Sequence, residues 1–441
     1  VRCCTQNGVR GGNATVHFPI WHQEIEDILV LKNNKGTEDN RVRRMDYSIQ
    51  MSKLFYERFI NEEDITLFSP HAVPGLYEAF GTDKFDALYK KYEKDKNIPK
   101  KTIAAQELFA DLLKERAETG RIYIMNIDHS NSHSSFKDKV SMSNLCQEIT
   151  LPTTPIKGID DPDGEIALCI LSAINVGAIG NLNELETLCD LSVRALDEII
   201  ELQDYPVKAA EVSTKSRRSL GIGYIGLAHY LAKNGVKYSD PKAWELVDRL
   251  SEAFQYYLLR ASCDIAEEKG KCSAFDRTKY ADGLLPIDHY KKEVDEIVVH
   301  KQRMAWETLR KDILKYGLRH STLSAQMPSE SSSVVSNETN GIEPPRALLS
   351  IKKSKKGPLK QIVPGFPNLK NAYTLLWDMG SNEGYIKIVS VMQKYFDQAI
   401  SGNWSYNPLQ FENNEVPLSV MAQDMLMAYK YGWKTSYYQN T

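Results

Sequence analysis

The chain has 441 residues and a formal net charge of −3, with 42% hydrophobic and 26% charged residues. This composition is typical of a globular protein, and the small net charge excludes a nucleic-acid-binding protein that relies on bulk positive charge. No apolar run approaches the roughly 18 residues of a membrane-spanning helix, and seven cysteines in so long a chain do not make a disulfide scaffold.

The predicted elements alternate between helix and strand along most of the chain. Helical periodicity predicts the helices, and runs of β-branched and aromatic residues predict the strands. In chain order we expect a loop over 1–13, a helix over 48–60, a short strand and Pro/Gly loop over 65–75, a helix over 103–118, strands over 121–127 and 169–176, helices over 183–202 and 239–270, a strand over 321–327, helices over 382–400 and 417–431, and a C-terminal strand in KTSYYQNT. This order predicts an α/β fold with a largely parallel sheet. There is no repeat, linker or low-complexity tract, so one large domain over 1–441 is the simplest organisation.

A glycine-rich motif in the middle of the chain matches the pattern GxGxxG. It occupies 221–226, and a dinucleotide-binding fold would require a strand just before it and an acidic residue about 20 residues later. The preceding VSTKSRRSL is polar and basic, and the pattern through GLAHYLAKNG predicts a helix throughout. We therefore interpret these glycines as sites of close helix packing.

The beginning of the chain, VRCCTQNGVRGGN, has no apolar signal core. The odd number of cysteines, without a CxxC pair, predicts reduced thiols in the cytoplasm. The first residue is Val rather than Met, so we expect a fragment, a processed product or one piece of a split protein.

The segment Ser143–Glu148 carries the most informative chemistry. If this segment is extended, the side chains of Asn144, Cys146 and Glu148 face the same way. An amide, a thiol and a carboxylate would then reach one small substrate. A single cysteine is more often a small buried hydrophobe, and its reactivity depends on its environment. The spacing alone therefore leaves a structural role open.

The motif N-L-C-x-E resembles the active-site loop of class I ribonucleotide reductase large subunits. Four other segments resemble that family in the same order along the chain. They are CTQNGVRGG (4–12), EIALCILSAINVGAI (165–179), MPSESSS followed by NGIEPPR (327–346), and the terminal TSYYQNT. The resemblance implies most of a ten-stranded α/β barrel with C-terminal helices. It divides 1–441 into a specificity loop (1–13), an active-site loop (143–149), a phosphate loop (327–333) and a radical-relay strand (434–441).

The same resemblance implies a thiyl-radical reduction of ribonucleoside diphosphates to deoxyribonucleoside diphosphates, for DNA synthesis. Cys146 would become the thiyl radical and abstract the 3′ hydrogen. Glu148 would act as the general base on the 3′-hydroxyl, and Asn144 would orient the ribose. Two electrons would come from a thiol pair that closes into a disulfide, with Cys169 as one member.

Further site residues follow from the other segments. Glu330, Ser331 and Ser332 would bind the substrate, because hydroxyls and free N–H groups at a helix start suit a diphosphate; serine clusters are otherwise ordinary turns or caps. Tyr437 and Tyr438 would pass the oxidising equivalent to Cys146. Gln6 and Arg10 would belong to the specificity loop, which responds to nucleoside triphosphate effectors and whose glycines permit more than one backbone state.

Three features of the family are missing from the sequence. The second reducing cysteine lies upstream of the specificity loop in the family, whereas the only cysteines here, Cys3 and Cys4, lie within that loop. The regulatory ATP cone and most of the effector site would also lie upstream, and the tail with a cysteine pair would follow Thr441. We therefore expect that the chain does not turn over alone and needs an N-terminal large-subunit segment or polypeptide.

The radical source is expected in another polypeptide. Di-metal carboxylate sites use paired Glu-x-x-His motifs, and none of the nine histidines has Glu three residues before it. We therefore expect no metal in this chain, a separate small subunit with a di-metal centre and the initiating radical, thioredoxin or glutaredoxin as the reductant, and an oligomer without membrane or nucleic-acid partners. Three alternatives remain: a non-catalytic or regulatory reductase remnant, a glycyl-radical reductase, and a plain α-helical binding module.

Overall fold

Three parallel strands organise the first third of the chain. The computed structural model describes residues 5–6, 10–168, 170–354 and 357–441. Its four-stranded sheet has the order β13-β7-β4-β3, in which β3, β4 and β7 are parallel and β13 is antiparallel to β7. The strands of this part are β3 (Thr15–Pro19), β4 (Asp46–Met51), β5 (Asp64–Phe68), β6 (Lys100–Ala104), β7 (Ile122–Asn126) and β13 (Thr435–Ser436). The helices are α1 (Ile25–Leu29), α2 (Lys53–Ile60), α3 (Leu76–Ala79), α4 (Phe85–Lys94), α5 (Ala105–Thr119) and α6 (Ile127–Ser132).

The second part of the chain surrounds another parallel pair, β8 (Ile170–Asn175) and β9 (Leu220–Ile225). Single parallel bridges extend this pair from Ile222 to Ser324 and from Gln326 to Ile400. The helices are α7 (Glu184–Leu202), α8 (Lys208–Arg217), α9 (Leu227–Lys233), α10 (Pro241–Lys269), α11 (Pro286–His289), α12 (Trp306–Tyr316), α13 (Glu330–Val335), α14 (Glu383–Gln393) and α15 (Leu418–Lys430). The remaining strands are β1 (Thr5–Gln6), β2 (Arg10–Gly11), β10 (Leu349–Ser354), β11 (Gly357–Ile362), β12 (Trp404–Ser405) and β14 (Gln439–Asn440).

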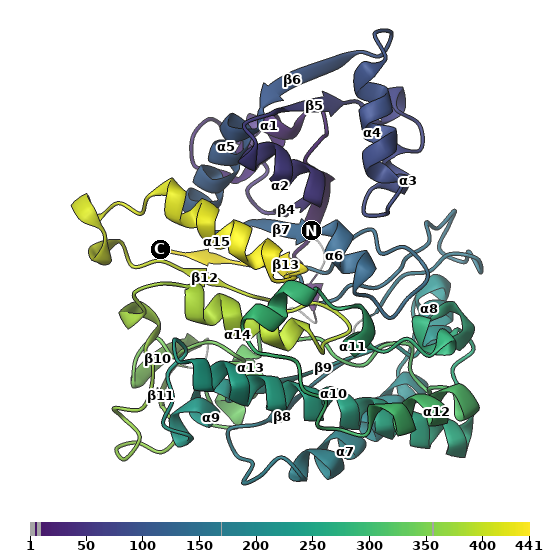
Figure 1. Ribbon diagram of the computed structural model, residues 1–441, viewed down its shortest axis with the longest axis vertical. Helices are drawn as coiled ribbons and strands as arrows, with labels where there is room; N and C mark the ends of the chain where they lie inside the picture. The colour runs from purple at the N-terminus through teal and green to yellow at the C-terminus, as the bar shows by residue number, and fades with distance from the viewer. Residues whose placement is uncertain (1–4, 7–9, 169, 355–356) are drawn as a thin grey trace.

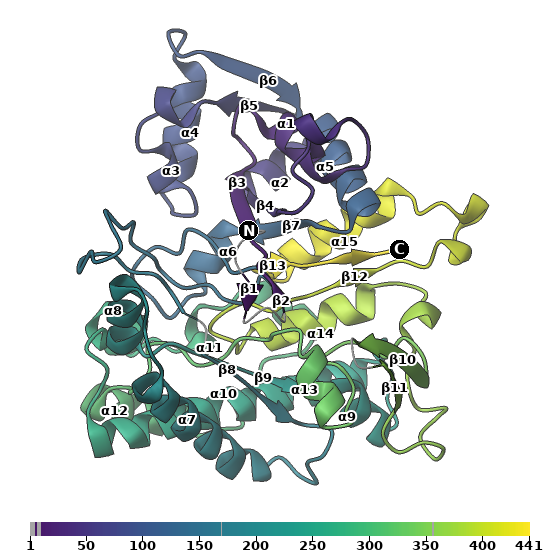
Figure 2. The same ribbon diagram turned by 180° about the vertical axis from the view of Figure 1, so that it is seen from behind.

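The C-terminal segment joins the two parts. Figures 1 and 2 show α14, α15 and the last strands lying between the purple-to-blue first part and the teal-to-green second part. The contact is direct, because β13 pairs with β7 while the adjacent β14 pairs with β12. The α/β prediction is confirmed, and the C-terminal segment lies between the two parts of the molecule.

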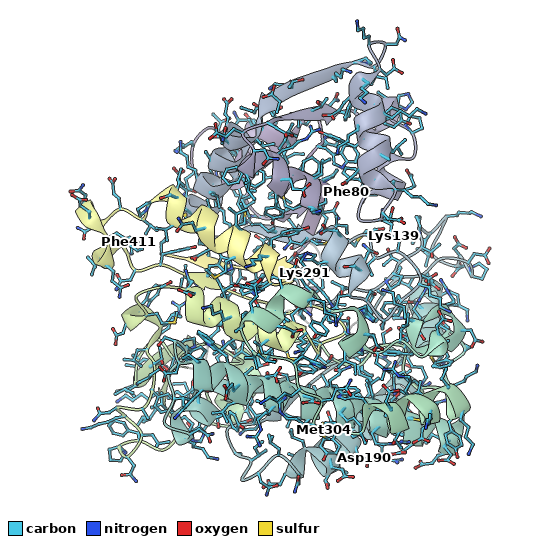
Figure 3. All side chains as sticks on the ribbon, viewed as in Figure 1. Phe80, Lys139, Asp190, Lys291, Met304 and Phe411 are labelled. Carbon is cyan, nitrogen blue, oxygen red and sulfur yellow. The ribbon has the colours of Figure 1, made fainter. Side chains whose placement is uncertain are left out.

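Apolar side chains fix both parts from within. In the first part, Trp21, Phe55, Phe80, Phe85 and Tyr89 pack edge to face or tilted, and all five are buried; Figure 3 labels Phe80 in this cluster. Each such side chain contributes on the order of 1.5–3 kcal/mol by leaving water. In the second part, the long helix α10 lies against α7, α12 and α14. No helix in the described ranges is long and apolar enough to cross a membrane.

The predicted helix over 48–60 is wrong in its first four residues. These belong to the parallel strand β4, and the helix α2 begins only at Lys53. Every residue of β4 is buried, because the strand is covered on both faces. Its residues DYSIQM nevertheless alternate strictly between polar and apolar, which is the pattern of a strand, and the helical interpretation of 48–60 overlooked it.

The predicted helix through the glycine motif is also wrong. Residues Leu220–Ile225 form β9, and α9 starts after Gly226, whose φ is 83°. The predicted helix packing is wrong as well, because the glycines allow close packing between strands: a Cβ on Gly223 would lie 2.6 Å from the carbonyl oxygen of Ala325. The first five motif residues belong to the strand itself. These glycines therefore leave room for the neighbouring segment around Ala325 and do not form a phosphate loop.

Two other predicted elements are shorter than expected. The predicted helix over 382–400 ends at Gln393, and 321–327 forms only the bridges at Ser324 and Gln326. The carboxylate of Asp397 explains both observations, because it accepts hydrogen bonds from the backbone N–H groups of Leu323 (3.0 Å) and Ser324 (2.9 Å). A helix through Asp397 would lose this tie between the two segments.

A buried histidine pair predicts acid sensitivity. The rings of His133 and His289 lie 5.1 Å apart, and burial and then nearby lysines lower the pKa of His133 well below its usual value and that of His289 to about 3. The unfolded histidines titrate near pH 6.5, so between these values the folded state binds fewer protons. The free energy of unfolding should therefore be full above pH 6.5 and fall below it, by up to about 2 kcal/mol per histidine at pH 5. Urea unfolding at pH 7 and pH 5 measures this loss. His289→Gln should lose less than the parent chain, and equal losses would contradict the assignment.

Candidate active site

The segment 141–149, which carries the three predicted active-site residues, is an irregular turn held against β4. It is not extended, since Gln147 has a φ of 69°, a left-handed conformation that residues other than glycine rarely adopt. Ser48 on β4 donates a hydrogen bond to Oε1 of Gln147 (2.9 Å), and Gln50 donates from Nε2 to the carbonyl of Ser141 (2.6 Å). The strand beneath the turn thus holds a conformation that the turn would not adopt by itself.

Glu148 is buried where this turn ends, and two side chains hydrogen-bond to its carboxylate. The hydroxyl of Ser401 lies 3.1 Å from Oε2, and Asn144 is the second side chain. Burial raises the pKa of Glu148, whereas the hydrogen bonds from Asn144 and Ser401 oppose this rise. The turn therefore brings Asn144 and Glu148 together without strand alternation, and it leaves a carboxylate that accepts a proton readily.

Two adjacent tyrosines of the C-terminal segment, Tyr437 and Tyr438, form a continuous contact that begins at Cys146. The hydroxyl of Tyr437 donates to Sγ of Cys146 at 3.4 Å, and the rings of Tyr437 and Tyr438 are 3.8 Å apart. Burial, followed by the neighbouring Cys146, raises the pKa of Tyr437 far above its ordinary value, so the phenol keeps its proton. Oxidation of this tyrosine must therefore move the proton together with the electron. The arrangement suits the transfer of an oxidising equivalent between Tyr438 and Cys146.

Sequence reasoning missed Arg121 and Tyr123, which lie beside the tyrosine pair. The ring of Tyr123 is 4.9 Å from that of Tyr437 and 5.8 Å from that of Tyr438. The guanidinium of Arg121 lies 4.7 Å over the Tyr438 ring and donates to its hydroxyl at 3.3 Å. Both residues come from the predicted strand over 121–127, where their spacing of two places them on one face. Only the pairing of β7 with β13, across more than 300 residues, reveals that this face meets the tyrosines.

A cavity of about 560 Å³ lies on the Tyr438 side of the site. Its lining includes Tyr438, the predicted residue Glu330, and parts of the segments 338–347 and 361–364. Ser331 and Ser332 follow Glu330 in the first turn of α13, and both are exposed. The structure thus places the predicted phosphate loop at a cavity, although only Glu330 of the three predicted residues lines it.

Glu343 and Asn403 form a second carboxylate–amide contact in this cavity. Asn403 donates from its amide to Glu343, and its Oδ1 accepts a hydrogen bond from the backbone N–H of Tyr438 (3.0 Å). Burial raises the pKa of Glu343 to about 7. None of these residues, nor Ser401, was singled out from the sequence: Glu343 lies within the motif NGIEPPR, which could have pointed to it, whereas no motif contains Asn403 or Ser401.

Three predicted residues cannot be placed completely. Cys169 lies outside the described residues, as do Cys3 and Cys4, and only the backbones of Gln6 and Arg10 are described. Gln6 pairs with Arg10 in the short antiparallel pair β1–β2, so the predicted loop over 1–13 contains two short strands.

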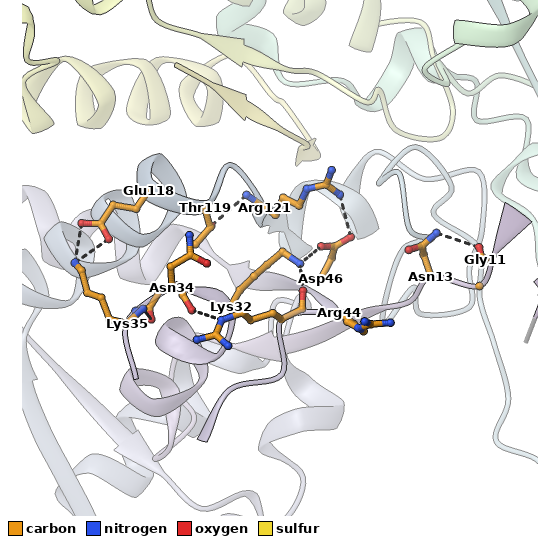
Figure 4. Close-up of a pocket in the computed structure, with 13 residues that line it drawn as sticks. Gly11, Asn13, Lys32, Asn34, Lys35, Arg44, Asp46, Glu118, Thr119 and Arg121 are labelled. Atoms are coloured by element: carbon orange, nitrogen blue, oxygen red, sulfur yellow. Dashed lines mark hydrogen bonds and ion pairs between the residues drawn. The ribbon is translucent and has the colours of Figure 1, made fainter. Parts of the chain in front are cut away.

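A second cavity, of about 710 Å³, lies beside the segment that follows this pair, and Gly11 and Asn13 contribute to its lining. Figure 4 shows its inner wall, where Lys32 and Arg121 both approach the carboxylate of Asp46, at 2.7 Å and 3.7 Å. Among the described residues, no three His, Cys, Asp or Glu side chains gather as ligands of a metal ion would.

The chain is similar to ribonucleotide reductases over its whole length. A family model described as the ribonucleotide reductase barrel domain matches residues 1–439. The chain is 58% identical over 446 aligned positions to the ribonucleoside-diphosphate reductase subunit alpha of Haemophilus influenzae and 55% identical to ribonucleoside-diphosphate reductase 1 subunit alpha of Escherichia coli. It is 44% identical to the subunit alpha of enterobacteria phage T4. All of this chain is covered in each comparison, but it spans only 59% of the length of these relatives.

The matched model confirms the barrel class that the motifs predicted. In the described part of the chain, the strands form separate short sheets, one of four strands and five of two, and do not close into a continuous hydrogen-bonded cylinder. The turn 141–149 touches both parts of the molecule, because the backbone N–H of Ala399 donates to the carbonyl of Glu148 (2.9 Å) and Thr435 donates to the carbonyl of Gln147 (2.7 Å). The turn 141–149 therefore contacts both sets of strands.

Proposed function

Because the chain belongs to the ribonucleotide reductase family, we propose that it is the radical-bearing portion of a large subunit that reduces ribonucleoside diphosphates to deoxyribonucleoside diphosphates. The observation that carries this proposal is the contact of 3.4 Å between the hydroxyl of Tyr437 and Sγ of Cys146, at the end of a stacked tyrosine pair. In this proposal 1–441 is one catalytic barrel domain, with its specificity loop at 1–13, active-site loop at 143–149, phosphate loop at 327–333 and radical-relay strand at 434–441.

The radical reaches the substrate in hydrogen-atom steps. A Tyr438 phenoxyl takes the hydroxyl hydrogen of Tyr437, and the resulting Tyr437 phenoxyl takes the hydrogen of the Cys146 thiol. The Cys146 thiyl then abstracts the 3′ hydrogen of the ribose. An S–H bond and this C–H bond are close in strength, so the last step is reversible. The two tyrosines already have the ring contact that the first step requires.

The buried carboxylate of Glu148 removes the proton of the 3′-hydroxyl, which makes loss of the neighbouring 2′-hydroxyl as water feasible. Asn144 hydrogen-bonds to the same carboxylate and orients the ribose. A thiol pair that includes Cys169 supplies the proton of this water and the hydrogen that replaces the hydroxyl at C2′, and it closes into a disulfide as it gives up two electrons; Glu148 returns its proton to the 3′-oxygen. The Cys146 hydrogen returns to C3′, which restores the thiyl radical.

Glu330, Ser331 and Ser332 bind the substrate in this proposal, at the cavity that also contains Glu343. Gln6 and Arg10 adjust the choice of base in response to nucleoside triphosphate effectors. The support for the first group is the position of Glu330 in the cavity wall beside Tyr438. For the second group, the support is the pairing of β1 with β2 directly before the strand β3.

The partners follow from what the chemistry needs. A small subunit supplies the di-metal centre and the first radical, and Tyr438 receives that radical. An N-terminal large-subunit segment supplies the second reducing thiol, thioredoxin or glutaredoxin supplies the electrons, and the assembly is an oligomer. Its location in the cytoplasm stays a prediction.

Reconstitution distinguishes this function from that of a regulatory remnant. Coexpression of the chain with an upstream large-subunit segment and a small subunit should give reductant-dependent formation of deoxyribonucleoside diphosphates. The chain alone should give none. Robust activity from the chain alone would refute the need for the upstream segment, and an inactive complete assembly would refute the function and favour the remnant.

Loss of the Ser401 hydroxyl should slow this reaction. Ser401 contacts both the carbonyl of Cys146, at 2.5 Å, and the carboxylate of Glu148. Ser401→Ala removes both contacts, and we expect kcat to fall about tenfold, equivalent to about 1.4 kcal/mol, with little change in KM. The control is Ser130→Ala, which removes a buried hydroxyl of α6 that donates to the carbonyl of Asn126 at the end of β7. Unchanged kcat in Ser401→Ala would exclude this positioning role.

A further inference from the structure

Strand β3 touches the active-site turn at two points. Thr15 donates from Oγ1 to the carbonyl of Leu145 at 3.4 Å. Nε2 of His17 lies 3.0 Å from the carbonyl oxygen of Ser143 and 3.3 Å from its backbone nitrogen. Thr15 and His17 are two residues apart and therefore occupy the same face of β3. This face is directed at the turn that carries Cys146.

His17 is the one titratable side chain of β3, and it is held neutral. Burial lowers the pKa of His17 to about 4, although the hydrogen bond with Ser143 opposes this shift. Its Nδ1 is buried and has no hydrogen-bond partner among the described residues. A neutral ring can donate from Nε2 to the Ser143 carbonyl or, in the other tautomer, accept from its N–H. Either tautomer ties β3 to the same residue.

The contact with Ser143 continues to Asn144. Oγ of Ser143 donates to the carbonyl of Ile149 at 2.7 Å, and the N–H of Ile149 donates to Oδ1 of Asn144 at 3.1 Å. A displacement of Ser143 must therefore alter the position of the Asn144 amide, the group assigned above to the ribose.

At its N-terminal end, where Thr15 touches the turn, β3 follows the β1–β2 pair after only Gly12, Asn13 and Ala14 (Figure 2). The strand is held in place along its whole length, because its five residues pair in parallel register with β4, from Thr15 opposite Asp46 to Pro19 opposite Gln50. A shift of the β1–β2 pair therefore reaches Thr15 and His17 through a few residues of a short, paired strand rather than through a long loop.

We propose that β3 couples the specificity loop to the active-site turn, and that His17 is the positioning residue that makes this connection. The inference rests on the proposed function, since it gives that function a path from the effector-responsive loop to Asn144 and Cys146. His17 touches no substrate in this scheme. It acts through Ser143, so its loss should weaken the effector response more than basal turnover.

The experiment uses the reconstituted assembly of this chain, its upstream segment and the small subunit. For the parent and each variant, kcat/KM is measured for two ribonucleoside diphosphates with and without a nucleoside triphosphate effector. His17→Leu removes the hydrogen bond, and the effector-induced change in substrate preference should shrink about fivefold or more, the range of a typical allosteric coupling. His17→Gln retains a donor and an acceptor near the Nε2 position and should restore the response to within about twofold of the parent.

Two further variants keep the result decisive if His17→Leu does not fold. Thr15→Val is nearly isosteric and removes only the Leu145 contact, so it should reduce the response in the same direction. Val16→Thr makes the reverse change on the opposite face of β3 and should leave the response unchanged. An effector response in His17→Leu and Thr15→Val equal to that of the parent would overturn the inference. Failure of the proposed function would appear differently, as the absence of an effector response or of turnover in the parent itself.

Discussion

Cys146→Ser should abolish deoxyribonucleotide formation in the reconstituted assembly, by at least about 1,000-fold, which corresponds to about 4 kcal/mol in the barrier. The change replaces one atom, and the surrounding turn is held by backbone and side-chain contacts that do not involve the sulfur. The O–H bond of serine is much stronger than the S–H bond of cysteine. The Tyr437 radical therefore has no hydrogen that it can take at this position, and the chemistry stops before the substrate reacts.

The control for this variant is another cysteine that the mechanism does not use. Cys189 is fully buried in α7, and burial raises the pKa of its thiol above its ordinary value. Cys189→Ala should keep turnover and lose on the order of 1 kcal/mol of stability from the small cavity it leaves. Deoxyribonucleotide assays and urea unfolding on both variants separate the two effects. Substantial turnover in Cys146→Ser would exclude the thiyl mechanism and favour a regulatory remnant.

The long amphipathic helices could be predicted from the sequence almost to the residue. The helix expected over 239–270 is α10, Pro241–Lys269, because Pro241 starts it and Gly270 ends it with a φ of 89°. The interior strand β4 could have been predicted, since its residues DYSIQM alternate between polar and apolar; the helical pattern of α2, extended backwards, hid it. The glycine motif could not be predicted as a strand, because its glycines make room for a neighbouring strand and a local pattern does not contain that neighbour.

The candidate site shows the same division. Motif resemblance proposed Asn144, Cys146 and Glu148 as site residues, but the argument from strand alternation was wrong, because Gln147 turns the chain with a positive φ. Ser401 lies more than 250 residues from Glu148 in the chain, and nothing local marks it. Residues whose role depends on contacts between positions far apart in the sequence can be recognised only from the three-dimensional structure. His17 belongs to the same class, because its role depends on Ser143, far along the chain.

Tyr437→Phe should stop turnover as completely as Cys146→Ser, by at least about 1,000-fold, while substrate and small-subunit binding stay intact. Phenylalanine keeps the ring contacts with Tyr438 and Tyr123 but lacks the hydroxyl that donates to Cys146. A ring without an O–H group has no hydrogen to give to the Tyr438 radical and cannot pass one on. The matched control is Tyr224→Phe, which removes a buried hydroxyl bonded to Ser251 at a distance from the relay and should remain active. The decisive measurement is the fate of the radical: when turnover is started in Tyr437→Phe, electron paramagnetic resonance should show that the oxidising equivalent stays in the small subunit or on Tyr438. Product formation at a rate near that of Tyr224→Phe would mean that Cys146 is oxidised by another route.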